Sequence, residues 1–209
     1  MKKYLPVLIL LLLFSSPILF AQPRPVLTIK VANNIDPVYR KMVADAVKLI
    51  NEIIHDPEFE RGFVGHHFDW ERLGGNVRNG LTAQGAFDTL YRWTDTARIN
   101  LVIKPRGLRP GVYLSGTMGS TGPGQNLTTT YRNWLLLDPP CYNCTMITYA
   151  SHIAHEFCHQ RNFFDKDVRN QSDFRDVVPY AVGDLMCAFI QRKYPADNCN
   201  CQTKPVRCN

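Results

Sequence analysis

Two histidines and a glutamate, His155, Glu156 and His159, have the residue types and the spacing of a metal-dependent hydrolytic site. Residues four apart project from one face of an α-helix, one turn apart, so the two imidazoles can reach the same Zn²⁺ ion. Glu156 lies beside the first ligand, where a carboxylate can hold a zinc-bound water, take its proton as it attacks a carbonyl, and pass that proton to the leaving amine. The string predicts a hydrolase with one catalytic Zn²⁺ ion and Glu156 as its catalytic general base.

Two other interpretations of this string stay open, because a His-Glu-x-x-His string is short enough to occur in unrelated proteins. The two histidines can face solvent on a surface helix. Alternatively, the site can hold a metal without peptidase activity, if a third ligand is lost or the cleft is blocked. The segment over residues 145–162 contains no proline or glycine and has an apolar face, which favours the helix that a metal site needs.

A catalytic zinc usually keeps three protein ligands and one open position, so a third ligand has to be found. No histidine follows His159 and no glutamate follows Glu156. A downstream third ligand must therefore be an aspartate, unless an upstream residue returns to the site. The candidates are Asp165, Asp167, Asp173, Asp176, Asp184 and Asp197.

The string from His155 to Asp165 resembles the metzincin pattern HExxHxxGxxH of the zincin superfamily, in the form ending in Asp that snapalysin-like secreted bacterial metallopeptidases carry. The resemblance implies that His155, His159 and Asp165 are the zinc ligands and that Glu156 is the general base. Asn162 stands where the pattern has glycine. Asparagine tolerates the left-handed conformation that is wanted there better than most residues do.

Three further residues are candidates for supporting roles. The resemblance implies a methionine turn beneath the metal, and Met186 is the one methionine after the motif, although its place in an expected helix also suits core packing. Tyr180 can donate a hydrogen bond to the oxyanion of a tetrahedral intermediate, or it can simply pack. His152, three residues before His155, can support the metal site from a neighbouring helix face or be exposed.

The remaining chain predicts the elements that would position these residues. Asp36 and Pro37 are typical of a helix start, and apolar residues spaced three to four apart predict a helix over residues 37–54. Strands are expected over residues 26–31, 63–70, 97–104, 112–117 and 133–137, and helices over 145–162 and 178–190. With 45% hydrophobic and 20% charged residues the chain is globular, and no linker divides it.

This order of elements resembles that of metzincin-like catalytic domains. The resemblance implies an α/β (α+β) zincin-like domain over residues 22–194. Its sheet would be mixed, mostly parallel and twisted, with an N-terminal helix and a metal-binding helix beside it. One antiparallel edge strand would fall in residues 111–119, where an extended substrate can add by backbone pairing. Loops over residues 73–87 and 107–124 would form the cleft walls.

Residues 1–21 have the pattern of a secretory signal peptide, with Lys2 and Lys3 followed by an apolar run that ends at Ala21. A retained membrane anchor is the alternative. Removal of the segment takes away two lysines and no acidic residue, which lowers the formal net charge from +6 to +4. That charge is too modest to indicate nucleic acid as a partner. We expect a secreted monomer, extracellular or periplasmic, without stable membrane insertion.

All seven cysteines lie in the last third of the chain, and in an exported protein this favours disulfide bonds. The Cys-rich tail over residues 195–209 is expected to be stapled to the body. Cys158 is a candidate partner for Cys187, and a buried free thiol is the alternative. A four-thiolate zinc site is another interpretation of Cys141, Cys144, Cys199 and Cys201.

Two functions from different classes follow from these patterns. The favoured one is a secreted zinc-dependent endopeptidase that cleaves a protein or peptide by metal-activated water. The alternative is a non-catalytic zincin-fold secreted binding protein, with the metal retained or lost, that recognises a protein or an envelope component.

Overall fold

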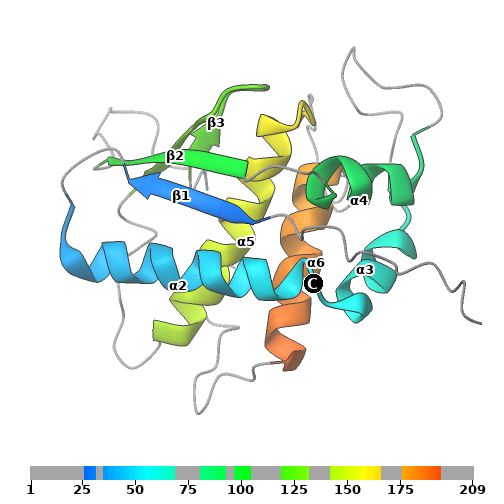
Figure 1. The fold of residues 1–209 in the computed structure, drawn as a ribbon, viewed down its shortest axis with the longest axis horizontal. Coiled ribbons are helices and arrows are strands. Elements are labelled where there is room, and N and C mark those ends of the chain that lie inside the picture. The colour runs from blue at the N-terminus through cyan, green and yellow to red at the C-terminus, as the bar shows by residue number, and fades with distance from the viewer. Residues whose placement is uncertain are drawn as a thin grey trace, which may run out of the picture.

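The computed structural model of this chain describes residues 26–31, 35–68, 81–92, 97–104, 119–131, 142–165 and 176–193. Within these ranges it has five helices and a four-stranded mixed sheet, which is a mixed α/β architecture of the α+β kind (Figure 1). The elements in chain order are β1 (Leu27–Val31), α2 (Pro37–Ile53), α3 (Pro57–Val64), α4 (Ala83–Tyr91), β2 (Ala97–Lys104), β3 (Gly119–Thr121), β4 (Leu127–Tyr131), α5 (Tyr142–Gln160) and α6 (Val178–Lys193).

The sheet has the strand order β1-β2-β4-β3. β1 pairs with β2 and β2 with β4 in parallel, whereas β3 pairs with β4 in the antiparallel sense. The expected mixed, mostly parallel sheet with one antiparallel edge strand is therefore confirmed. The edge strand is Gly119–Thr121, so it begins at the last residue of the expected range 111–119, and the rest of that range lies outside the described residues.

The expected N-terminal helix is confirmed as α2. The Asp36 side chain accepts a hydrogen bond from the Val38 amide at 2.8 Å, and Pro37 occupies the first turn, where its missing N–H removes no helical bond. The buried stripe recurs at helical spacing and packs on the sheet and on α5. Its members are Met42, Val43, Ala46, Leu49, Ile50 and Ile53.

The helix that carries the candidate metal ligands is α5, and it lies in the core between α2 and α6. Its apolar face is at most 2% exposed. Figure 1 shows α5 crossing behind α2 and running beside α6. The helices expected over residues 145–162 and 178–190 are both confirmed as α5 and α6. That apolar face consists of Ile147, Ala150, Ile153, Ala154 and Phe157.

The strand expected over residues 63–70 is wrong where the structure describes it, because Phe63 lies in helix α3. Phe59 and Phe63 are four apart, so a helix points both rings to one side. There they contact Phe87 and Tyr91 of α4, with ring centroids 5.3 to 6.4 Å apart. This aromatic cluster holds α3 and α4 together, and the Asp56 side chain caps the start of α3 by accepting from the Glu58 amide at 2.9 Å.

Two other elements were not expected. Residues 83–87, which were expected in a loop, form the first part of α4. The Thr82 hydroxyl caps this helix by accepting from the Gly85 amide at 3.1 Å. β4 is a polar strand, Leu127–Tyr131, in which Thr128 and Thr130 are buried. The strands expected over residues 112–117 and 133–137, the leader and the tail lie outside the described residues.

Cys158 lies on α5 as a buried free thiol, and its Sγ donates to the Ala154 carbonyl at 3.3 Å. The expected pairing of Cys158 with Cys187 is therefore wrong, and the alternative of a free thiol is confirmed. Cys141, Cys199 and Cys201 lie outside the described residues. Among the helices that the structure describes, none is both long and apolar enough to cross a bilayer.

Candidate metal centre

The last two turns of α5 carry the three motif residues. His155 and His159 project from the same helix face, with ring centroids 5.0 Å apart and the rings nearly perpendicular. Their side chains are 16% and 8% exposed, so neither lies on an open surface. The interpretation as two solvent-facing histidines on a surface helix is therefore wrong.

The chain reverses direction directly after α5. Asn162 has a φ of 65°, which is the left-handed conformation expected at this position. The Phe163 amide donates to the Cys158 carbonyl and the Asn162 amide to the His159 carbonyl, both at 3.0 Å, which is the Schellman pattern of a helix end. The Gly124 amide also donates to the His159 carbonyl, at 2.9 Å. This turn returns the chain to the histidine face of α5.

The turn at Asn162 supports a prediction on stability. Asn162→Ala should lower the free energy of unfolding by about 1 kcal/mol, because a residue with an ordinary Cβ resists the left-handed region. Asn162→Gly should stay near the parent value, because glycine adopts that region freely. Urea unfolding of the three proteins measures the difference. Equal losses in both variants would mean that the Asn162 side chain, rather than its backbone conformation, stabilises the turn.

Asp165 is the residue that this turn delivers to the site. Its Oδ2 lies 3.1 Å from His159 Nε2 and 3.4 Å from His155 Nε2. One possible ligand atom from each of the three residues lies within 4.8 Å of the other two. Of the other candidate aspartates, Asp176 faces His66 at 3.5 Å and Asp184 is not part of this cluster. The remaining three, Asp167, Asp173 and Asp197, lie outside the described residues.

The hydrogen bonds around the cluster leave a ring nitrogen of His159 and a carboxylate oxygen each of Asp165 and Glu156 available to a cation and its water. The Phe163 carbonyl can only accept, so His159 Nδ1, 2.8 Å away, carries a hydrogen. When His159 loses the Nε2 proton that it shares with Asp165, the neutral ring therefore presents its lone pair at Nε2. Asp165 Oδ1 and Glu156 Oε2 are buried without a hydrogen-bond partner in the described part of the chain. Buried polar atoms are rarely left unpaired, so two such carboxylate oxygens beside two imidazoles fit a site for a cation and its water.

The charges of the cluster stabilise one another. Burial alone would lower the pKa of His159, but its hydrogen bond to Asp165 and the charge of that carboxylate outweigh burial and raise it. Burial would raise the pKa of Asp165, but hydrogen bonds from His155 and His159 hold it well below its usual range. Asp165 is therefore a carboxylate at neutral pH, which is the form that binds a metal.

Glu156 lies on the inner side of α5 and is 3% exposed. Burial raises the pKa of its carboxyl, and the nearby His155 and a hydrogen bond from the Thr121 hydroxyl of β3 offset part of that rise. A carboxylate with a raised pKa is a better proton acceptor than an ordinary glutamate. The contact with Thr121 also connects Glu156 to the edge strand of the sheet.

His152 is buried and connects α5 to the sheet rather than facing solvent. Its Nε2 lies 3.1 Å from the Thr130 hydroxyl of β4, and its Nδ1 lies 3.6 Å from Glu156 Oε1. Burial, together with the charges of His155 and His159, lowers the pKa of His152 to about 3, so the ring is neutral at pH 7. His152 is thus placed beside the candidate base, not in the ligand cluster.

Gly119 allows the edge strand to approach this network. A Cβ built on Gly119 would lie 2.2 Å from the Thr129 carbonyl oxygen and 2.7 Å from His152 Nε2, so no larger residue fits without movement. Gly119, Thr121 and Thr130 were all missed from the sequence. Their roles depend on the pairing of β3 with β4, and the threonine-rich β4 has no apolar pattern that would have identified it.

α6 supplies the last two candidates. The Tyr180 ring packs edge-on against His155, with centroids 4.6 Å apart. Burial, with smaller effects of Asp165 and Glu156, raises the pKa of Tyr180 to about 12, so its hydroxyl stays protonated and able to donate. Met186 is fully buried within α6, in a helix rather than a turn, which agrees with the core-packing interpretation. Comparisons with protein-family models, curated proteins and solved structures find no match to this chain.

Proposed function

We propose that this chain is a secreted zinc-dependent endopeptidase of zincin-like fold. His155, His159 and Asp165 would hold the metal, and Glu156 would act as the general base. The observation that carries the proposal is the convergence of Asp165 Oδ2 on both imidazole Nε2 atoms, at 3.1 and 3.4 Å. Beside them lies the buried Glu156 Oε2, which has no hydrogen-bond partner among the described residues. An ion pair alone would account for the contact of Asp165 with the histidines, but it leaves the buried Glu156 Oε2 without a partner among the described residues, and a metal-bound water would supply one.

The donor set suits zinc. Two imidazole nitrogens and one carboxylate oxygen are a common three-ligand set for a catalytic Zn²⁺ ion, which keeps a further position open. When bound, such an ion polarises the scissile carbonyl and lowers the pKa of a bound water. His159 is prepared for this role, because its Nδ1–H donates to the Phe163 carbonyl and fixes the orientation of the ring.

Glu156 would carry out the proton transfers. Its Oε2 accepts a proton from the attacking water, as the water oxygen bonds to the scissile carbonyl carbon. The same carboxyl then gives the proton to the leaving amine nitrogen as the C–N bond breaks. Burial suits Glu156 to both steps, because a raised pKa makes it a competent acceptor and afterwards a competent acid.

The substrate would be a peptide in an extended conformation. β3 is the edge strand of the sheet on the side of the site, and its residue Thr121 hydrogen-bonds Glu156. The free edge of such a strand can pair with an added peptide backbone, which would align a scissile bond along the site. Tyr180, whose hydroxyl is neutral and whose ring contacts His155, is the candidate donor to the developing oxyanion.

The test of the proposal uses the chain purified from residue 22 onward. We expect one zinc ion per chain by elemental analysis, cleavage of an unfolded protein such as casein, loss of cleavage with a chelator, and recovery when zinc is restored. Zinc bound in stoichiometric amount without cleavage of any unfolded substrate would favour the alternative, a secreted binding protein. A chain that neither binds zinc nor cleaves would overturn both the metal site and the peptidase.

A further inference from the structure

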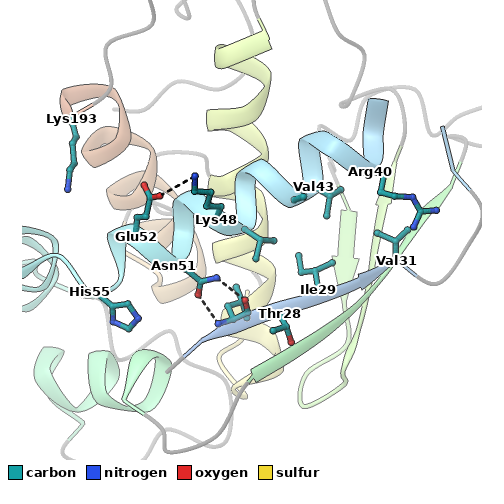
Figure 2. Close-up of a pocket in the computed structure, with 13 residues that line it drawn as sticks. Thr28, Ile29, Val31, Arg40, Val43, Lys48, Asn51, Glu52, His55 and Lys193 are labelled. Carbon is teal, nitrogen blue, oxygen red and sulfur yellow. Dashed lines mark hydrogen bonds and ion pairs between the residues drawn. The ribbon is translucent and has the colours of Figure 1, made fainter. Parts of the chain in front are cut away.

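A second feature lies at the other edge of the sheet, in the seam between β1 and α2. It is an open groove of about 980 Å³, and Figure 2 shows it running along β1 beneath α2. β1 and β3 are the two opposite edges of the sheet, separated by β2 and β4. At a spacing of about 4.8 Å per strand, the two edges are roughly 14 Å apart, so the groove is separate from the metal centre.

Part of the β1 backbone has no hydrogen-bond partner on the groove side among the described residues. The Asn51 side chain donates to the Leu27 carbonyl at 2.9 Å and accepts from the Leu27 amide at 2.8 Å, as a residue of a neighbouring strand would (Figure 2). Backbone groups alternate along a strand, so those of Ile29 and Val31 also point away from β2. Neither has a hydrogen-bond partner on that side within the described residues.

The walls of the groove are apolar. Ile29 and Val31 of β1 face Val43 and Val47 of α2, and three of these four side chains remain partly exposed. Alternate residues of an added strand would point into this apolar seam. Removal of such side chains from water on binding would stabilise the complex.

The rim of the groove is positively charged. Arg40 lies at the Val31 end and has no ion-pair partner among the described residues (Figure 2). Lys48 and Lys193 also line the groove, but Lys48 lies 4.0 Å from Glu52 and Lys193 is ion-paired with Asp56 at 2.5 Å. Arg40 is therefore the lining cation that is left to attract a carboxylate of a partner. A partner with carboxylates is therefore favoured, and a second copy of the same basic edge is not.

We propose that the β1–α2 groove binds an extended acidic segment of a partner protein, which adds to the sheet as a strand beside β1. The Ile29 and Val31 backbone groups would pair with the segment, its alternate apolar side chains would fill the seam, and a carboxylate would pair with Arg40. An acyl chain fits less well, because it would cover these backbone groups without supplying hydrogen bonds. The site is independent of the proposed hydrolysis and would bind with or without zinc.

The first test measures the binding of a fluorescent peptide of about seven residues that alternates valine and glutamate. Fluorescence anisotropy with the chain from residue 22 onward should give saturable binding below about 1 mM. N-methylation of every second amide on one edge of the peptide should abolish binding, because it removes the donors that pair with β1. N-methylation along the other edge, which would face solvent, should leave binding nearly unchanged. Lack of saturation, binding that survives N-methylation of both edges alike, or displacement of the peptide by oleate would overturn the proposal.

The second test compares matched variants of the chain. Arg40→Glu should weaken peptide binding by at least about fivefold, whereas Lys30→Glu, the same charge change on the opposite face of β1, should leave it nearly unchanged. Val31→Pro removes the backbone N–H that points away from β2 into the groove, and an edge strand tolerates this loss because that N–H takes no part in the sheet. The substitution should weaken peptide binding more than Val31→Ala does. Equal effects of the two charge variants, or of the two Val31 variants, would overturn the placement in this groove. Thermal unfolding checks that all four variants fold.

Discussion

Glu156→Gln is expected to slow peptide hydrolysis by about 10²- to 10⁴-fold, the range by which a positioned general base accelerates such reactions. Glutamine keeps the shape of the side chain but cannot accept a proton from water. The proposed zinc ligands His155, His159 and Asp165 are unchanged, so the zinc content should stay the same. The measurement is kcat on an unfolded protein substrate together with elemental analysis of the same preparation.

The same substitution should not destabilise the fold. Burial raises the pKa of Glu156, and its Oε2 has no hydrogen-bond partner in the described part of the chain, so the charged form is costly to bury. Thermal unfolding of the zinc-free proteins should therefore place the variant at or above the parent. Glu58→Gln, an exposed glutamate on α3, is the matched control and should change neither activity nor stability. A Glu156→Gln protein that keeps full activity would remove Glu156 from the role of base.

The parts of the candidate site that were predictable from the sequence are those set by local geometry. The spacing of His155 and His159 fixes their common helix face whatever surrounds the helix. The left-handed turn at Asn162 was expected from the residue type, and its observed φ of 65° confirms it. The helix start at Asp36 and Pro37 belongs to the same class, because a cap involves residues only two or three apart.

The parts that were not predictable depend on contacts between distant segments. β4 is polar in sequence, yet Thr128 and Thr130 are buried, because Thr128 pairs with Thr121 at 2.7 Å and Thr130 with His152 at 3.1 Å. A hydroxyl that is satisfied in this way does not oppose burial. The assignment of Phe63 to a strand is a different kind of miss, because α3 begins with the same local signal as α2. Asp56 caps the helix by accepting from the Glu58 amide at 2.9 Å, and Pro57 occupies its first turn.

Asp165→Ala is expected to lower zinc affinity by more than about 100-fold, beyond the loss that follows when a group that merely orients a ligand is removed. The variant would leave two protein ligands where a catalytic zinc usually has three. Competition with a calibrated chelator measures the affinity. Asp176→Ala is the matched control, because Asp176 faces His66 at 3.5 Å and takes no part in the cluster, so its zinc affinity should equal that of the parent.

A second measurement on Asp165→Ala, the pKa of His159, distinguishes a metal ligand from a carboxylate that only lies beside the metal. In the zinc-free protein, Asp165 holds the pKa of His159 above its ordinary value against the opposing effect of burial. Asp165→Ala should therefore lower the pKa of His159, as followed by NMR titration of the imidazole. If that pKa falls while zinc affinity is unchanged, Asp165 only neighbours the metal, and the third ligand has to be sought among Asp167, Asp173 and Asp197 or in water. If the pKa of His159 and the zinc affinity both fall, Asp165 is a metal ligand, and the turn at Asn162 places it beside the histidines of α5.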